Sequence, residues 1–399
     1  MTTKHLSYLT PCLTSFLTPY YTIYRSPHYI RAKSNRPLHM MKVAFFLGSL
    51  NRGGAETLLA DVFAQGKALP FEAVCIYRKE GTLSDAFRAT EVPMLRLPRK
   101  RSWLLYGLKL RRLVKREGVD ILHAQSAFNA TLAIIFLAFT PVRIVLTLHG
   151  DAFNNANKLY KRFVFRHCLR LVCVSESERA KYLAHPIPGV ADRFVVIPNG
   201  INFNKFGYTS STGDGTVVRM CMVGNFVPEK NQYLICQALK ELASQGVSFD
   251  FSFIGARVPA YSACYDRCVS YCEQNGLSSK VHFLGSRNDV PDLLSGMDAF
   301  VYSSKSETFG IAVVEAMAMG LPTFVNDLEV FDEITHNGEF AVLYKSDNVQ
   351  DLCEKIQDYL HNRPDYHARA QANASVIRSR YSIATHTTNL QSIYSQIRL

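Results

Sequence analysis

The sequence lacks an apolar run long enough to cross a membrane. Its most apolar stretch, residues 130–148 (ATLAIIFLAFTPVRIVLTL), is interrupted by Pro141 and Arg143 after about ten apolar residues, whereas a membrane-spanning helix needs about 20. The first 40 residues are rich in Thr, Tyr, Ser and Pro, without the continuous apolar segment of a signal peptide. The 130–148 stretch is therefore expected to form a buried helix followed by a buried strand.

Motifs of nucleic-acid-binding proteins are also missing: there is no zinc-finger spacing, RNA-binding aromatic signature or helix-turn-helix pattern. The formal net charge is nevertheless +12 and is unevenly distributed. Residues 1–40 carry five basic and no acidic residues, residues 41–200 carry 24 basic and 12 acidic, and residues 201–399 carry 16 basic and 21 acidic. The basic first half suggests an anionic partner, and we favour phospholipid headgroups or a phosphorylated acceptor over nucleic acid.

The ten cysteines show neither a disulfide framework nor a metal-binding pattern. Several lie in apolar strands such as LVCVS and RMCMVG, which is typical of a reduced cytosolic protein with packed thiols. Cys264, Cys268 and Cys272 recur every four residues. On a helix such a stripe extends about 12 Å, too far to converge on one ion, so we expect a packed or membrane-proximal thiol face.

What is present is a regular alternation of short apolar runs with amphipathic stretches. A chain of 399 residues is too long for one ordinary core, so two domains are expected. In the first half the strands are predicted at residues 42–50, 71–77, 92–97, 119–124, 143–149, 169–175 and 194–200. Residues 201–216 have no periodicity and are the expected linker.

The alternation restarts after this linker. The second set of strands is predicted at residues 217–225, 249–255, 281–285, 299–304, 322–327 and 340–344. Near-continuous apolar strands separated by helices indicate parallel sheets covered on both faces. The predicted fold class is therefore α/β, with two Rossmann-like, doubly wound parallel-sheet domains facing across a cleft, and ligands at the carboxyl ends of the strands.

A dinucleotide-binding fingerprint is absent from the first domain. The segment NRGGAETLLADVFAQG (51–66) follows the first strand, and Gly53 and Gly54 allow a tight turn into a helix whose amides suit an anionic or hydroxyl-rich ligand. The spacing is not G-x-G-x-x-G, and no acidic residue ends a second strand at the usual distance. As a bare Gly-Gly turn, this segment carries little functional information.

The second domain contains a lysine and two glutamates at helix starts. Lys230 lies beside a predicted helix N-terminus, where its charge and the helix amides would together hold a diphosphate; alternatively it is an ordinary solvated lysine. Glu307 and Glu315 flank the loop and first turns of the segment SKSETFGIAVVEAMAMGLPTF (304–324). They are placed to bind sugar hydroxyls while the amides between them meet a phosphate. The alternative is that Glu307 caps the helix and Glu315 is a surface residue.

The segment ETFGIAVVEAMAMGLP resembles the E-x7-E motif of the retaining GT-B glycosyltransferases of glycosyltransferase family 4 (glycosyl transferases group 1). Further segments resemble that family in the same order along residues 41–380: GGAET, TLHG, VCVSES, VIPNGIN, VGNFVPEKN and VHFLG. A GT-B epimerase acting on a nucleotide-linked amino sugar is disfavoured, because the order of the E-x7-E motif matches the transferases better.

The resemblance implies a role for each matching residue. Lys230 would contact the donor diphosphate, Glu315 the ribose hydroxyls, and Glu307 hydroxyls of the transferred sugar, while Phe309 and Gly310 give backbone amides to the phosphate. Gly54 would lie near the diphosphate or acceptor. His149 matches the family's histidine at the reacting centre; otherwise it is a core histidine at a strand end.

One position departs from the family pattern. The arginine that usually follows the glycine of the VG turn is replaced by Asn225, which brings no charge to the departing diphosphate. Another cation substitutes for it, or turnover is weaker. A non-catalytic nucleotide- or carbohydrate-binding protein of the same fold is therefore the alternative to an enzyme.

The favoured function is that of a retaining hexosyltransferase in cell-surface glycan biosynthesis, such as that of lipopolysaccharide or capsule. It would move a sugar from a nucleotide diphosphate sugar to a hydroxyl of a lipid-linked or polysaccharide acceptor. No Asp-x-Asp metal motif is evident. We therefore expect no metal site and no cofactor, with Lys230 and helix amides stabilising the leaving diphosphate.

Four segments are expected along the chain. Residues 1–40 would be a disordered extension, or precede a true start at Met40 or Met41. Residues 41–205 would form the acceptor-binding domain and residues 206–382 the nucleotide-sugar-binding domain. Residues 383–399 would form a C-terminal helix that packs back on the first domain.

A basic cluster accompanies apolar residues on a predicted helix near residues 102–117. Its members are Arg99, Lys100, Arg101, Lys109, Arg111, Arg112, Lys115 and Arg116, with Trp103, Leu104, Leu105, Tyr106, Leu108 and Leu110 among them. One interpretation is peripheral, salt-sensitive contact of a cytoplasmic protein with the inner membrane face. The other is an ordinary surface helix whose apolar stripe packs on the sheet.

Overall fold

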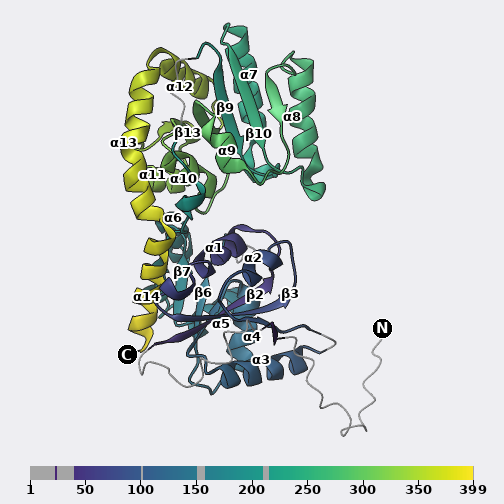
Figure 1. The fold of residues 1–399 in the computed structure, drawn as a ribbon, viewed down its shortest axis with the longest axis vertical. Coiled ribbons are helices and arrows are strands. Elements are labelled where there is room, and N and C mark those ends of the chain that lie inside the picture. Colours follow the sequence, from purple (N-terminus) through teal and green to yellow (C-terminus); the bar gives the residue numbers. More distant parts are fainter. Residues whose placement is uncertain (1–22, 25–39, 100–101, 151–157, 210–214, 399) are drawn as a thin grey trace.

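The computed structural model of the protein describes residues 23–24, 40–99, 102–150, 158–209 and 215–398. The expected extension over residues 1–40 lies outside the described residues except for a two-residue strand, β1, and for Met40. Lys100 and Arg101 of the basic cluster, and Cys12 among the cysteines, also lie outside them. The structure has two α/β domains stacked along its long axis (Figure 1).

The first domain is built on a sheet of order β1-β4-β3-β2-β5-β6-β7-β8, parallel except for β1, which pairs antiparallel with β4. Its strands are β1 Ile23–Tyr24, β2 Lys42–Ser49, β3 Glu72–Lys79, β4 Met94–Arg96, β5 Ile121–Ala124, β6 Arg143–Thr147, β7 Arg170–Cys173 and β8 Phe194–Val196. All seven strands predicted for this half are confirmed. They are buried because helices cover both faces.

Alternate residues of β2 show how both faces are used. The helices of this domain are α1 Gly54–Phe63, α2 Ser84–Arg88, α3 Trp103–Glu117, α4 Ala127–Phe136, α5 Lys158–His167 and α6 Glu176–Leu183. Val43, Phe45 and Leu47 pack with α1, α2 and a helix from the C-terminus, whereas Ala44 and Phe46 pack with α3, α4 and α5. The expected buried helix and strand over residues 130–148 correspond to α4 and β6.

The second domain has a fully parallel sheet of order β11-β10-β9-β12-β13-β14. Its strands are β9 Val218–Val223, β10 Phe249–Ile254, β11 Val281–Phe283, β12 Ala299–Tyr302, β13 Thr323–Asn326 and β14 Val342–Tyr344. All six strands predicted for this half are confirmed, and so is the doubly wound α/β class. The order changes direction at β9 and β12, which is where such sheets open a ligand-binding crevice.

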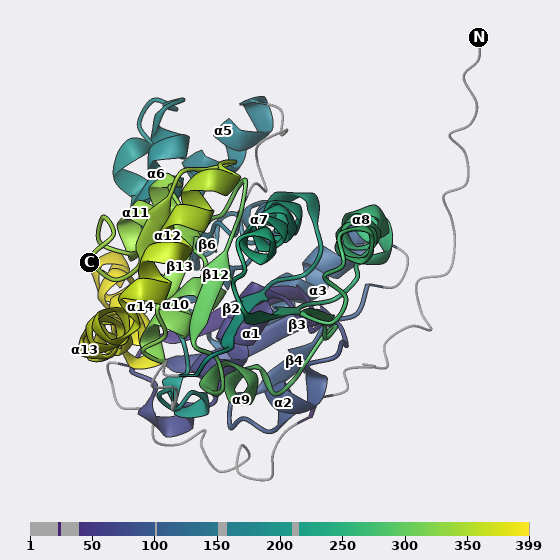
Figure 2. The same cartoon turned by 90° about the horizontal axis from the view of Figure 1, so that it is seen from above.

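Seven helices of the described residues cover this second sheet. They are α7 Gln232–Ser244, α8 Ser262–Gln274, α9 Val290–Ser295, α10 Ile311–Ala318, α11 Glu329–Ile334, α12 Val349–His361 and α13 Arg363–Tyr381. Seen from above, α7 and α8 lie side by side, whereas α13 lies on the opposite side of the domain (Figure 2). No helix in the described part of the chain combines the length and apolar content needed to cross a membrane.

The last helix, α14 Ile383–Arg398, leaves the second domain and returns to the first. It runs on from α13 along one side of the molecule (Figure 1). Ile383, Leu390 and Tyr394 join the core formed by β2 and α1. Tyr394 also contacts the buried His123 of β5, with 2.6 Å between the Tyr394 hydroxyl and His123 Nδ1. The chain therefore crosses between the domains twice, which ties them together at the side of the cleft.

Candidate active site

A cavity of about 670 Å³ opens between the two domains at the carboxyl ends of their strands. The first domain contributes the Gly53–Gly54 turn and His149, and the second contributes the loop after β12 and the start of α10. Every residue proposed from the sequence for the site lines this one cavity: Gly54, His149, Asn225, Lys230, Glu307, Phe309, Gly310 and Glu315. Residues far apart in the sequence thus meet at the crevice that parallel sheets provide.

Lys230 is held by two partners at the floor of the cavity. It ends a short 3₁₀ turn, Pro228–Lys230, and Asn231 then enters the left-handed region with φ 48° before α7 begins. Its ammonium donates to the Tyr302 hydroxyl at 2.6 Å and forms an ion pair with Glu307. The alternative of a solvated lysine is therefore wrong for this structure.

Tyr302 completes this group, although sequence patterns treat it only as a strand residue. Its hydroxyl donates to Glu307 Oε2 at 2.9 Å. Burial, with the Glu307 charge beside it, holds the pKa of the Tyr302 hydroxyl well above its ordinary value. The phenol therefore remains protonated and orients both the ammonium and the carboxylate.

The loop between Glu307 and α10 depends on Gly310. This glycine has φ +87°, and a Cβ at this position would lie 2.9 Å from Phe331 Cε1. Phe309 is buried and packs its ring edge-on to Tyr381, with the centroids 5.5 Å apart. The first amides of a helix have no intrahelical partner, so the start of α10 presents donors to this cavity.

Glu315 lies one helical turn inside α10 and faces Asp61 of α1 and Lys205 of the linker. Desolvation raises its pKa to about 8; the Asp61 charge adds to this effect, and Lys205 opposes it. Lys205 and Asp61 are themselves paired, with 2.5 Å between Nζ and Oδ1. The Glu315 carboxyl therefore holds its proton at neutral pH. It is not an ordinary surface glutamate.

His149 follows β6 and is oriented by Gln125, which follows β5. The distance from His149 Nε2 to Gln125 Oε1 is 2.9 Å. Because this oxygen only accepts hydrogen bonds, Nε2 carries the ring proton and Nδ1 remains an acceptor. Desolvation, with His386 adding repulsion, lowers the His149 pKa to about 4. A neutral imidazole at physiological pH suits hydrogen bonding to a hydroxyl better than proton transfer.

Asn225 is used as a structural hydrogen-bond acceptor. Its Oδ1 accepts from the Ala256 amide at 2.9 Å. The neighbouring backbone is tight, since a Cβ on Gly255 would lie 2.0 Å from the Gly224 carbonyl oxygen. Two cations that sequence reasoning missed, Arg52 and Arg287, line the same cavity. The position of Arg52 directly before the Gly-Gly turn is the feature of the sequence that could have indicated its place in the site.

Three contacts join the domains beside the cavity. The Glu333 carboxylate of α11 accepts from the amides of Glu176 and Ser177 at 2.9 and 3.1 Å. The Ser175 hydroxyl donates to the Thr308 carbonyl at 2.8 Å. The VCVSES segment therefore includes the start of α6, and it contacts the second domain there.

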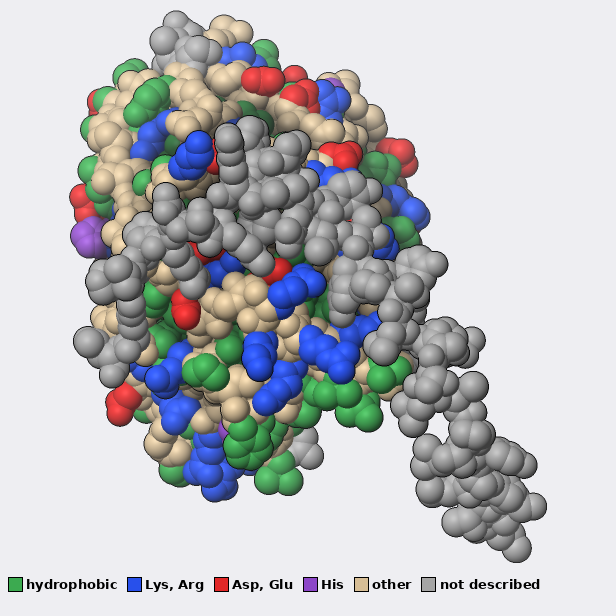
Figure 3. Space-filling model, turned by 60° about the horizontal axis from the view of Figure 1, so that its bottom comes forward, with side chains coloured by type: hydrophobic (Ala, Val, Ile, Leu, Met, Phe, Trp, Pro, Cys, Tyr) green, Lys and Arg blue, Asp and Glu red, His purple; other side chains and the backbone are tan. Residues whose placement is uncertain are grey.

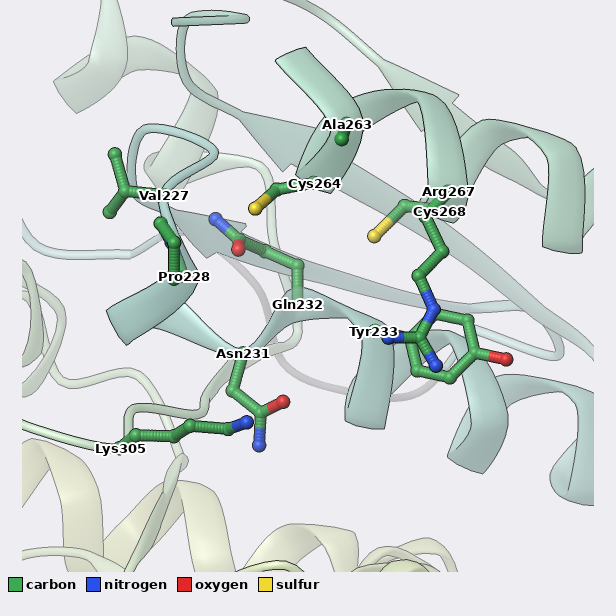
Figure 4. Close-up of a pocket in the computed structure, with 10 residues that line it drawn as sticks. All are labelled: Val227, Pro228, Asn231, Gln232, Tyr233, Ala263, Cys264, Arg267, Cys268 and Lys305. Carbon is green, nitrogen blue, oxygen red and sulfur yellow. The ribbon is translucent and has the colours of Figure 1, made fainter. Parts of the chain in front are cut away.

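A second, smaller cavity of about 280 Å³ lies between α7 and α8 (Figure 4). Arg267 stacks over Tyr233 at one end, 3.5 Å from the ring centroid, and Lys305 lies at the other.

Cys264 and Cys268 form part of the wall of this smaller cavity, and Cys268 and Cys272 are buried. The expected thiol face is thus packed, and the nine described cysteines are free thiols. The described residues contain no cluster of His, Cys, Asp and Glu suited to a metal ion.

Comparisons with known proteins agree with this geometry. The family model described as Glycosyltransferase Family 4 matches residues 52–205, and the model described as Glycosyl transferases group 1 matches residues 211–376. An uncharacterized glycosyltransferase of Methanocaldococcus jannaschii is 27% identical over 285 residues, covering 68% of this chain and 74% of the relative. The UDP-Gal:α-D-GlcNAc-diphosphoundecaprenol α-1,3-galactosyltransferase of Escherichia coli is 27% identical over 272 residues, covering 62% and 68%.

Solved structures show the same fold. The crystal structure of HepE from Anabaena in complex with UDP superposes with a TM-score of 0.78 and 19% identity, covering 89% of this chain and 100% of that one. At 19% identity, this similarity establishes a shared fold.

Proposed function

Because this chain belongs to the GT-B glycosyltransferases of glycosyltransferase family 4, we propose that it is a retaining transferase that uses a nucleotide diphosphate sugar as donor. The acceptor is a hydroxyl of a lipid-linked or polysaccharide glycan, in cell-surface glycan biosynthesis. The observation that carries this proposal is the meeting of Lys230, Glu307 and Glu315 around one interdomain cavity. The E. coli relative is a galactosyltransferase that acts on a diphosphoundecaprenol-linked sugar, and this supports a lipid-linked acceptor.

In this proposal, charged and polar groups of the cavity bind the donor. Lys230 and the amides at the start of α10, beside Phe309 and Gly310, bind the diphosphate, and Glu315 binds the ribose hydroxyls. Glu307 receives hydroxyls of the transferred sugar, next to His149 on the facing domain. Gly54 leaves room for the diphosphate or acceptor, since a Cβ there would have Ile311 Cδ1 of the second domain as its nearest contact, at 3.7 Å.

The reaction is a substitution on one face of the sugar. The acceptor oxygen bonds to the anomeric carbon as the bond from that carbon to the diphosphate oxygen breaks, and the acceptor proton passes to the departing phosphate. Glu307 is held by Lys230 and Tyr302, so it orients the sugar instead of forming a covalent intermediate, unlike the nucleophile of a retaining glycosidase.

Charge stabilisation of the leaving diphosphate comes from Lys230, the α10 amides and the cations Arg52 and Arg287. We propose that no divalent metal ion and no cofactor take part. Rates in EDTA should then equal those in Mg²⁺, and a dependence on added Mg²⁺ or Mn²⁺ would contradict metal independence.

We place the protein in the cytoplasm, partly attached to the inner membrane face through α3. One face of this helix packs on the sheet through Tyr106, Leu110 and Leu113, as the surface-helix interpretation expects. On the rest of the helix, Leu104, Leu105 and Leu108 are exposed. They precede the basic residues of α3 in the sequence. Sedimentation with anionic liposomes should therefore depend on salt, and absence of co-sedimentation at low salt would contradict this attachment.

The transfer itself is tested with a panel of nucleotide sugars and an acceptor lipid extract. We expect release of a nucleoside diphosphate from at least one donor, and a product whose anomeric configuration by NMR equals that of the donor. Inversion would overturn the retaining mechanism, and no release from any donor would overturn the enzyme assignment.

A second candidate function, non-catalytic binding of a nucleotide or carbohydrate, is favoured only by Asn225 at the usual arginine position. The Glu307→Ala variant separates the two. Loss of product with nucleotide binding retained supports the transferase, whereas unchanged nucleotide binding with no product from the parent protein supports the binding protein.

A further inference from the structure

Arg78 lies on the carboxyl edge of the first sheet, outside the donor cavity. It is the last residue but one of β3, and β3 pairs with β2 up to Ser49, just before the Gly53–Gly54 turn. A Cβ on Gly48 of β2 would lie 3.3 Å from Arg78 Nη2. The guanidinium therefore rests over the end of β2, on the acceptor-binding domain.

Two aromatic rings hold this guanidinium in place. Its central carbon lies 5.6 Å from the Trp103 ring centroid at the start of α3 and 5.5 Å from that of Phe128 at the start of α4. The rings contact each other edge to face at 4.9 Å. Arg78 Nη1 is buried and has no hydrogen-bond partner, and no carboxylate pairs with this arginine among the described residues. Buried charged donors normally have partners, so this group is arranged for a ligand.

A second cation flanks the same ring. The Arg99 guanidinium carbon lies 4.7 Å from the Trp103 centroid. Both planar guanidinium groups lie against one indole, and the fork of N–H donors that each carries matches the oxygens of phosphate esters. A neutral polysaccharide would leave both charges unpaired.

An apolar surface continues from this site along α3. Trp103, Leu104, Leu105 and Leu108 are 37%, 62%, 59% and 43% exposed, and Phe128 beside them is 43% exposed. Figure 3 turns this side of the molecule forward and shows hydrophobic side chains next to Lys and Arg side chains. Apolar side chains this exposed, adjoining a cationic site, suit a ligand with a phosphate head and a hydrocarbon chain.

We propose that Arg78 and Arg99 bind the phosphate groups of a lipid-linked acceptor, whose hydrocarbon chain leaves over Trp103, Leu104 and Leu108. The acceptor sugar is then directed along the carboxyl edge towards His149. This inference rests on the proposed transferase function and narrows its acceptor to a lipid phosphate or diphosphate.

Trp103 is the only tryptophan of the chain, so its fluorescence reports directly on this site. The purified full-length protein is titrated with geranylgeranyl diphosphate in detergent micelles, with inorganic pyrophosphate and with empty micelles. We expect a saturable change in Trp103 emission with the lipid diphosphate, and binding of pyrophosphate at least about tenfold weaker because it lacks the chain. Equal binding of the two diphosphates, or an equal response to empty micelles, would overturn the proposed lipid phosphate site.

Variants test the role of Arg78. Arg78→Gln should weaken lipid diphosphate binding about tenfold or more, since a charged hydrogen bond is lost, and Arg78→Lys should bind with intermediate strength because it keeps the charge without the planar donors. The control Arg143→Gln, at an exposed position at the amino end of β6, should change binding less than twofold. Unchanged binding in a folded Arg78→Gln protein overturns the site.

Nucleoside diphosphate binding is measured by calorimetry on the same samples. If Arg78→Gln keeps full nucleotide affinity and loses the lipid, the acceptor site is supported. If the nucleotide binds normally and the lipid titration is unaffected by the variant, only this inference fails. If the parent protein binds no nucleotide, the proposed function itself fails.

Discussion

The Glu307 carboxylate forms an ion pair with the Lys230 ammonium across the floor of the interdomain cavity, and the Tyr302 hydroxyl bonds to both. The pair joins the turn before α7 to the loop before α10, two segments that follow neighbouring strands of the second sheet. A donor diphosphate would therefore meet a lysine already fixed in position, with little further ordering to be done on binding. The sugar would meet a carboxylate that has been oriented in the same way.

Replacing Lys230 by Ala should lower kcat/KM about 10²–10³-fold, the usual effect of losing one donor to charge that develops in a transition state. Tyr302→Phe removes only the shared hydroxyl, so we expect a loss below about tenfold, mainly through a higher KM for the donor. Steady-state kinetics with varied donor measure both. An equal loss in the two variants would show that the hydroxyl contributes as much as the ammonium and would contradict this prediction.

Glu315→Gln should stabilise the protein while weakening donor binding. The Glu315 pKa is raised from 4.5 to about 8, so the folded state keeps a proton that the unfolded state loses between these values. Its contribution to the free energy of unfolding therefore falls as pH rises from about 4.5 to 8. A glutamine at this position has no proton to lose in this range, so it avoids the cost of ionising a buried carboxyl.

Thermal unfolding of parent and variant at pH 5 and pH 8.5 checks this prediction. The gain in Tm should be larger at pH 8.5, by about 2–4 °C for each 1 kcal/mol recovered, and the exposed Glu273→Gln should show none. A gain that is independent of pH would show that Glu315 does not titrate in this range.

Glu333→Gln should loosen the contact between the domains. The carboxylate accepts two amides at the start of α6, and these charge-assisted bonds are stronger than those an amide oxygen makes. We expect a larger radius of gyration without nucleotide by small-angle scattering, and a higher KM for the donor. Glu329→Gln, at an exposed site on the same helix, is the control; an identical radius in both variants would contradict the proposed contact.

Gly310→Ala should destabilise the loop before α10. The position has φ +87°, and the new Cβ would lie 2.9 Å from Phe331 Cε1; the left-handed conformation alone costs about 1–2 kcal/mol. Chemical denaturation should show at least this loss. At Gly207, where a Cβ would have no atom within 4 Å, the same substitution should be near neutral, and equal effects at both sites would contradict the steric argument.

The parallel sheets were predictable because each strand is a short apolar run bounded by turn residues, as in KVAFFLGS or AFVY. Lys230, Glu307 and Glu315 were identified because their segments resemble a family and follow strands of one sheet. Tyr302, Gln125 and Arg78 were missed, since each acts through a partner from another element. Their roles depend on side chains that meet only in the folded protein.

The surface of α3 also shows where prediction from the sequence stops. Its sequence predicted both a stripe packed on the sheet and a basic, apolar face, and the structure contains both. Periodicity alone does not decide which of the five leucines of this helix are buried. Leu110 and Leu113 lie in the core, whereas Leu104, Leu105 and Leu108 are exposed.

We propose above all that the interdomain cavity binds a nucleoside diphosphate through Lys230. A thermal-shift screen of nucleoside diphosphates against the parent protein, Lys230→Ala and the control Lys305→Ala tests it most directly, because Lys305 lines the smaller cavity instead. We predict that at least one nucleoside diphosphate raises the Tm of the parent and of Lys305→Ala, since a ligand at 100 times its Kd adds about 2.7 kcal/mol, while Lys230→Ala loses most of the shift. No shift with any nucleotide, or an undiminished shift in Lys230→Ala, would contradict the account.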